Sequence, residues 1–155
     1  MNRMKHKFSA LAHGWLYAAG WRPGRVVRTG HWESVLKSAG NPIHPAVLTF
    51  LREFGGLKVT HPHWGLPGEF DFFHLSPSAA MEHFPIEEDG LEDANDRVGK
   101  PLCAIGTASG DRMILLMDAD GKIYTAVDDL LFLVGNTETE ALEALCADIK
   151  LPSIP

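Results

Sequence analysis

Hydrophobic residues near the start of the chain recur at the spacing of one helix face. They stand at i, i+3, i+4, i+7, i+8 and i+11, and are Phe8, Leu11, Ala12, Trp15, Leu16 and Ala19. The same spacing predicts a second helix over residues 31–39, which Gly40 can end, and a third over 45–54. Pro45 suits the first turn of the third helix, and Gly55 and Gly56 end it.

The stretch that follows the first helix contains two arginines and a Pro-Gly pair, so it could be an anion-binding loop or a structural corner. Gly20 predicts a left-handed helix cap, and Trp21 can supply the apolar contact of a Schellman motif. Pro23-Gly24 predicts a type II turn. We interpret the stretch as a corner, and expect Arg25 to tie it to a carboxylate of the body such as Glu53.

From residue 57 the pattern changes to the alternation typical of β-strands. Strands are predicted over 57–62, 69–75, 101–108, 112–117 and 122–127, and 130–134 is a strand or a short helix. Asp120-Gly121 predicts a hairpin, and Met113–Met117 is apolar on both faces and therefore central in the sheet. Ser76 caps a short helix or turn. Residues 86–98 form a polar helix or long loop, and the capping box Thr137–Glu140 opens a last helix that Pro152 ends. This order predicts an α+β fold with a mainly antiparallel sheet packed by N-terminal helices and a C-terminal helix.

The length of 155 residues suits one domain, which we place at 8–150 between a basic N-terminal tail, 1–7, and a C-terminal tail, 151–155. No apolar run is long enough to span a membrane. Polar and aromatic residues interrupt the apolar N-terminal stretch, so we expect no signal peptide. Cys103 and Cys146 each lie in an apolar element and are predicted to be buried free thiols, which fits a cytoplasmic protein.

The net charge of −6 is unevenly distributed. Residues 1–32 carry six Lys or Arg and no acid, whereas the rest carries eight basic and twenty acidic residues. An acidic body argues against direct nucleic-acid binding and favours a basic partner, although simple solubility explains it too. The densest acidic run is a solvated face, a docking patch for a basic protein, or a source of paired catalytic carboxylates; it holds Glu87, Glu88, Asp89, Glu92, Asp93 and Asp96.

The sequence contains few residue patterns that are typical of catalytic sites. The sequence has no nucleophile elbow, P-loop, dinucleotide fingerprint or zinc-protease helix motif. His61, His63 and His74 are either surface histidines or a metal site to which Glu69 and Asp71 could contribute. Asp118 and Asp120 resemble the start of a calcium loop, but Lys122 replaces the next oxygen donor and the hairpin explains them. We therefore expect no enzymatic activity, no metal and no cofactor.

Trp64 lies in a loop between Pro62 and Pro67, next to His63. Its ring either folds back onto the core or is exposed as an interface anchor. We count Trp64 and His63, with the acidic run, as candidate partner-binding residues.

Several stretches together resemble the third subgroup of the SUKH superfamily, the immunity proteins of bacterial polymorphic toxin systems. They are "AGWRPGR", "FLREFGGLKV", "PLCAIGTASGDRMILLMDADGKIYTAV" and "LFLVGNTETEALEAL", and the resemblance covers about residues 11–147. Within these stretches we assign a structural role, rather than a role in binding, to Gly20, Trp21, Pro23, Gly24, Arg25, Gly55, Gly56 and Gly121.

The resemblance implies an α+β fold and a non-enzymatic protein that binds and neutralises a cognate toxin domain, such as a basic nuclease or a deaminase. An acidic face could cover the nucleic-acid site of a nuclease. The alternatives are a SUKH-type scaffold with another partner and a His-based metal-dependent hydrolase. We expect a monomer.

Overall fold

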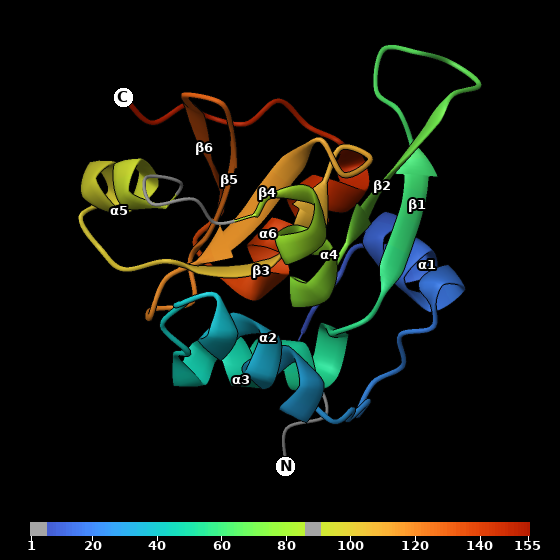
Figure 1. Ribbon diagram of the computed structural model, residues 1–155. Coiled ribbons are helices and arrows are strands. Elements are labelled where there is room, and N and C mark those ends of the chain that lie inside the picture. Colours follow the sequence, from blue (N-terminus) through green and yellow to red (C-terminus); the bar gives the residue numbers. More distant parts are fainter. Residues whose placement is uncertain (1–5, 86–90) are drawn as a thin grey trace.

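The structure is a computed structural model that describes residues 6–85 and 91–155. The three N-terminal helices are α1 (Ala10–Ala19), α2 (Gly30–Ser38) and α3 (Pro45–Phe54) (Figure 1). α1 begins where the Ser9 hydroxyl accepts a hydrogen bond from the Ala12 amide at 3.2 Å. It ends at Gly20, whose φ of 112° is left-handed, and the Trp21 amide donates to the Leu16 carbonyl at 2.9 Å. This is the predicted Schellman cap.

The buried face of α1 is narrower than predicted. Ala12 and Leu16 are fully buried, but Leu11 is 50 % exposed. α1 contacts β1 and α6, and Phe8, Trp15 and Ala19 of the predicted stripe are partly buried against the core.

The corner after α1 has the predicted turn. Gly24 has a φ of 83°, and the Arg25 amide donates to the Arg22 carbonyl at 3.1 Å, as in a type II turn. The expected pairing of Arg25 with the Glu53 carboxylate needs correction. The Arg25 guanidinium donates to the main-chain carbonyls of Glu53 (2.6 Å) and Gly55 (2.9 Å), at the C-terminal end of α3. Burial lowers the pKa of Arg25, and the charge of Glu53 partly opposes this shift.

The strands form one six-stranded sheet in the order β1-β2-β3-β4-β5-β6, and every neighbouring pair is antiparallel. Residues 130–135 are a strand, which resolves the alternative left open by the sequence. β3 is buried at every position, and β4 lies in the middle of the sheet as its two apolar faces predict. The strands are β1 (Lys58–Pro62), β2 (Phe70–His74), β3 (Cys103–Ala108), β4 (Met113–Met117), β5 (Ile123–Val127) and β6 (Leu130–Gly135).

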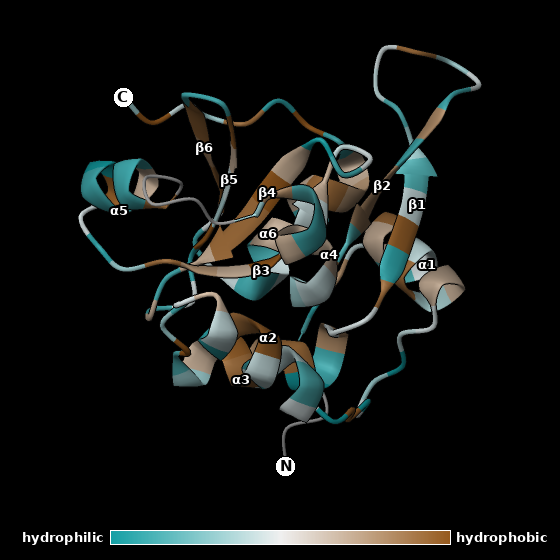
Figure 2. Cartoon of the chain, viewed as in Figure 1, coloured by the Kyte–Doolittle hydropathy of each residue, from teal (hydrophilic) through white to brown (hydrophobic). Residues whose placement is uncertain are grey.

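Helices cover both faces of the sheet. α6 (Glu138–Ala147) and α1 lie on one face, and α4 (Pro77–His83) lies on the other (Figure 1). α2 and α3 close one end, and α5 (Glu92–Val98) lies at the far edge. Figure 2 shows the hydrophobic colour concentrated on the central strand β4 and the hydrophilic colour over much of α5. The fold is therefore α+β, as predicted.

α6 begins at the Thr137 cap, whose hydroxyl accepts from the Glu140 amide at 3.1 Å. It ends earlier than Pro152, because Asp148 adopts a left-handed conformation with a φ of 52°. Ile149, which a helix ending at Pro152 would include, is consequently beyond the helix and 53 % exposed.

The residues after α6 return along the sheet. The Leu133 amide donates to the Pro152 carbonyl at 3.0 Å, and the Ile154 amide donates to the Leu131 carbonyl at 2.8 Å. Arg97 on α5 donates to the carbonyl of Ile154 at 2.7 Å. The outer edge of β6 is therefore covered by the chain itself.

Candidate protein-binding surface

The loop between β1 and β2, residues 63–69, projects beyond the body of the molecule (Figure 1). Internal main-chain hydrogen bonds hold its shape: His63 donates to Glu69 at 2.9 Å, and Glu69 donates to Leu66 at 2.9 Å. The Trp64 amide donates to the Asp148 carboxylate at 2.6 Å, which ties the loop to the end of α6. The loop is thus fixed at its base although its tip is in solvent.

The Trp64 side chain is exposed, which decides between the two alternatives in favour of an outward-facing ring. Trp64 is 75 % exposed, and its neighbours Leu66 and Phe70 are 51 % and 61 % exposed. Phe70 meets Trp15 of α1 edge to face, with ring centroids 6.5 Å apart. Exposed large apolar side chains on a projecting loop and on the strand next to it are typical of a protein-interaction surface.

A pocket of about 240 Å³ lies at the base of this loop, between the α6 face of the sheet and the C-terminal end of α6. Most of its wall is apolar and is made by Phe73, Ala108, Met113, Phe132, Ala144, Leu145, Ile149 and Leu151. Its polar lining includes His61, Asp71 and Asp148. His61 is buried and lies against Phe73, with ring centroids 5.8 Å apart.

His63 lies between two carboxylates beside this pocket. Its Nδ1 is 3.6 Å from Asp148 Oδ2, and its Nε2 is 4.0 Å from Asp71 Oδ2. The Asp71 side chain is only 8 % exposed, and the nearest guanidinium nitrogen, on Arg112, is 3.5 Å away. The loop base therefore concentrates negative charge next to an apolar wall.

The three-histidine metal site that the sequence left as an alternative is not formed. His74 pairs with Lys58, so these two side chains lie on the same face of the β1–β2 pair. His61 lies three residues after Lys58 in β1 and is therefore on the opposite face, because successive side chains of a strand alternate between the two faces. His74 instead faces α4's side of the sheet, where burial and the charge of Lys58 lower its pKa. His63 lies just beyond β1 and contacts Asp71 and Asp148.

Within residues 6–85 and 91–155, one group has metal-ligand geometry: His6, Glu53 and Glu138. His6 Nε2 lies 3.0 Å from Glu53 and 3.3 Å from Glu138, and Trp21 Nε1 donates to Glu53 at 3.1 Å. These contacts join the N-terminal segment to α3 and α6. Sequence reasoning missed the group because its members are far apart and match no ligand spacing.

The Asp118 carboxylate serves the hairpin, as predicted. Asp118 is fully buried and accepts hydrogen bonds from the amides of Asp120 (2.8 Å) and Lys122 (3.1 Å) and from the Tyr124 hydroxyl (2.9 Å). Burial and this carboxylate raise the pKa of Tyr124. Gly121, with a φ of 90°, completes the turn between β4 and β5.

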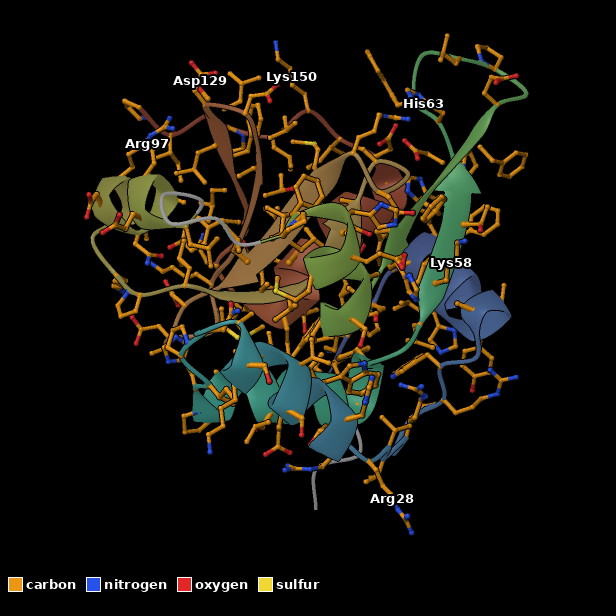
Figure 3. The ribbon with its side chains drawn as sticks, viewed as in Figure 1. Arg28, Lys58, His63, Arg97, Asp129 and Lys150 are labelled. Carbon is orange, nitrogen blue, oxygen red and sulfur yellow. The ribbon has the colours of Figure 1, made fainter. Side chains whose placement is uncertain are left out.

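The described part of the acidic run lies on α5, at the other side of the molecule. Glu87, Glu88 and Asp89 lie outside the described residues, whereas Glu92, Asp93 and Asp96 are exposed on α5. Figure 3 shows Arg97 of α5 and His63 at opposite sides of the sheet. The structure therefore does not bring the described part of the acidic run and Trp64 onto one surface.

A protein-family model described as SUKH-3 immunity protein matches residues 8–148. The chain belongs to the SUKH-3 immunity protein family. No curated protein and no solved structure gives a significant match.

The SUKH-3 match includes all six strands, the loop of residues 63–69 and α5. Immunity proteins are directed against toxins and are generally not enzymes. None of the described helices is both long and apolar enough to cross a membrane. Family membership therefore implies a toxin partner in general.

Proposed function

We propose that this SUKH-3 protein binds a cognate toxin domain in the cytoplasm and blocks its activity through the surface around Trp64, one copy of the chain per toxin domain. The observation that carries this proposal is the 75 % exposure of Trp64 on a loop fixed at its base. Tryptophan is among the residues that contribute most to binding at protein interfaces. Covering a toxin requires no catalytic group on the immunity protein.

The fixed loop favours tight binding for a further reason. Ordering a flexible loop on association costs free energy, and a loop held beforehand avoids most of that cost. The hydrogen bond from the Trp64 amide to Asp148 and the bonds between His63 and Glu69 hold the loop in this way. The main chain that carries the Trp64 ring is consequently held before the partner binds.

The test is co-expression of the chain with the toxin domain encoded beside its gene, followed by growth measurement and calorimetry of the purified pair. We expect wild-type protein to restore growth and Trp64→Ala to weaken binding by at least about 30-fold, the size of a typical hot-spot loss. Val26→Ala is the control, because Val26 is 73 % exposed on the corner after α1. A wild-type chain that neither binds the toxin nor restores growth would refute the proposed function.

The acidic run is a second candidate surface, favoured by the exposure of Glu92, Asp93 and Asp96 on α5. An acidic surface suits a nuclease with a basic nucleic-acid site. The test changes the whole run to Ser, at Glu87, Glu88, Asp89, Glu92, Asp93 and Asp96. Unchanged affinity would exclude this surface, whereas lost affinity with full binding by Trp64→Ala would move the interface to α5.

A further inference from the structure

The pocket at the base of the Trp64 loop has a polar lining that accepts hydrogen bonds. Asp71 and Asp148 contribute carboxylates. His61 Nδ1 lies 3.0 Å from the Pro62 carbonyl, which can only accept, so Nε2 of the neutral ring is an acceptor. The Thr125 hydroxyl donates to the Ile114 carbonyl at 2.9 Å and keeps its lone pairs. A ligand rich in donors therefore matches this lining.

Asp71 is weakly compensated for a buried carboxylate. Its Oδ1 accepts from the Phe72 amide at 2.8 Å, but its Oδ2 has Arg112 at 3.5 Å and His63 at 4.0 Å. The Arg112 side chain is 68 % exposed, so most of its charge remains in water. Buried carboxylates are ordinarily paired closely with a cation, because the loss of hydration is costly. A second cation brought to Asp71 would supply that pairing.

The rest of the pocket suits the stem of a long side chain. At about 240 Å³ it exceeds the about 150 Å³ of an apolar cavity that holds benzene, and its wall is mostly apolar. Lys150 also borders the pocket but is exposed. An aliphatic stem can therefore lie against Met113 and Phe132 while its charged end reaches the carboxylates.

We infer that this pocket is a socket for an arginine side chain of the bound toxin domain, placed next to Trp64. The inference rests on the proposed function and specifies the chemistry of the partner. Arginine fits better than other side chains because its planar guanidinium has five donors, no acceptor and a fixed charge. Asp71 and Asp148 pair with the guanidinium, and Trp64 covers the partner surface beside it.

The first experiment measures affinity for the cognate toxin domain by calorimetry. Asp71→Asn with Asp148→Asn removes both carboxylates, yet asparagine keeps an acceptor oxygen and tolerates the left-handed conformation of residue 148. The matched control is Glu82→Gln with Asp129→Asn, two exposed residues that do not line the pocket. Both double variants change the net charge from −6 to −4 by the same loss of two carboxylates.

We expect the pocket variant to bind at least about 30-fold more weakly than wild type, and the control to bind within about 3-fold of wild type. The reason is that the loss of a buried charge pair weakens binding more than the loss of long-range electrostatic attraction does. Circular dichroism and thermal unfolding of both variants establish that they fold. Equal losses in both variants would show general electrostatic attraction and overturn the socket.

The second experiment needs no toxin, so it separates failure of the socket from failure of the proposed function. N-acetyl-arginine methylamide is titrated into the free protein, with the citrulline analogue as the neutral probe of matching shape. We expect saturable NMR shifts at the Met113 and Ala144 methyl groups with arginine alone, and none in the pocket variant. Equal shifts with citrulline, or no shifts with arginine, would overturn the inference whether or not the toxin binds.

Discussion

Replacing Trp21 by alanine removes the side chain that joins the N-terminal corner to the core. Trp21 is 3 % exposed, lies against Phe54 with ring centroids 6.1 Å apart, and meets Phe8 edge to face at 5.4 Å. Its Nε1 donates to the Glu53 carboxylate at 3.1 Å. The substitution therefore removes apolar burial, ring contacts and a hydrogen bond together.

The magnitude follows from the buried area. A buried aromatic side chain removes about 150–250 Å² from water, worth about 4–6 kcal/mol at about 25 cal/mol per Å². Residual burial in the denatured chain reduces this to about 3–5 kcal/mol, which agrees with typical costs of Trp→Ala in cores. We expect the free energy of unfolding to fall by that amount.

The assay is urea unfolding followed by far-ultraviolet circular dichroism, with Trp64→Ala as the matched control. Trp64 is 75 % exposed, so its replacement should change the free energy of unfolding by less than about 0.5 kcal/mol. The two variants should also differ in function: Trp21→Ala binds toxin normally while folded, and Trp64→Ala does not. A Trp21→Ala protein within 1 kcal/mol of wild type, yet unable to bind its partner, would refute the interpretation of the corner as structural.

Three further changes test other parts of the structure by the same unfolding assay. Gly55→Ala should lower the free energy of unfolding by about 1–3 kcal/mol, because a Cβ there would lie 2.5 Å from the Trp32 ring; an unchanged free energy would contradict this packing. Asp118→Ala should lower the free energy of unfolding by about 2–4 kcal/mol, because it removes the acceptor of buried hydrogen-bond donors in the hairpin. Added calcium should not change the stability of the wild-type protein. Burial raises the pKa of the Cys103 and Cys146 thiols to about 12, so the unfolded chain releases their protons first. Stability should therefore fall as pH rises above about 8.5, by up to about 1.4 kcal/mol per pH unit for each thiol, and the double Ser variant should show a shallower fall.

Local signals in the sequence predicted the elements well because their causes are local. Gly20 and Gly24 adopt the left-handed conformations that their cap and turn require. Ser76 and Thr137 accept hydrogen bonds from the amides three residues later, at 3.2 Å and 3.1 Å. Each of these features depends on a few neighbouring residues, so no knowledge of tertiary contacts was needed.

The sequence-based predictions were wrong where tertiary packing determines the burial of a residue or the end of a helix. Leu11 has the right spacing for the buried face, but no element of the described structure covers it fully. Asp148 ends α6 early, in a conformation that also places its carboxylate against the Trp64 amide. No sequence pattern connects these two positions, so the support of the loop could not be predicted.

The candidate site was predicted only in part. Trp64 and His63 were identified from their loop, but the exposure of Trp64 depends on how residues 63–69 leave the sheet. Asp71 was considered as a metal ligand because it lies near the histidines in the sequence. The strand register instead turns it toward the α6 face, where it lines the pocket.

The pairing of residues 152–154 with β6 has a consequence for self-association through this edge of the sheet. Leu130–Gly135 is an uncharged strand of high β-propensity, and unpaired edges of this kind are templates for aggregation. The carbonyl of Pro152 and the amide of Ile154 occupy hydrogen-bonding positions that another chain would otherwise use. A chain shortened before Pro152 should expose this edge and self-associate, even though every helix and strand remains present.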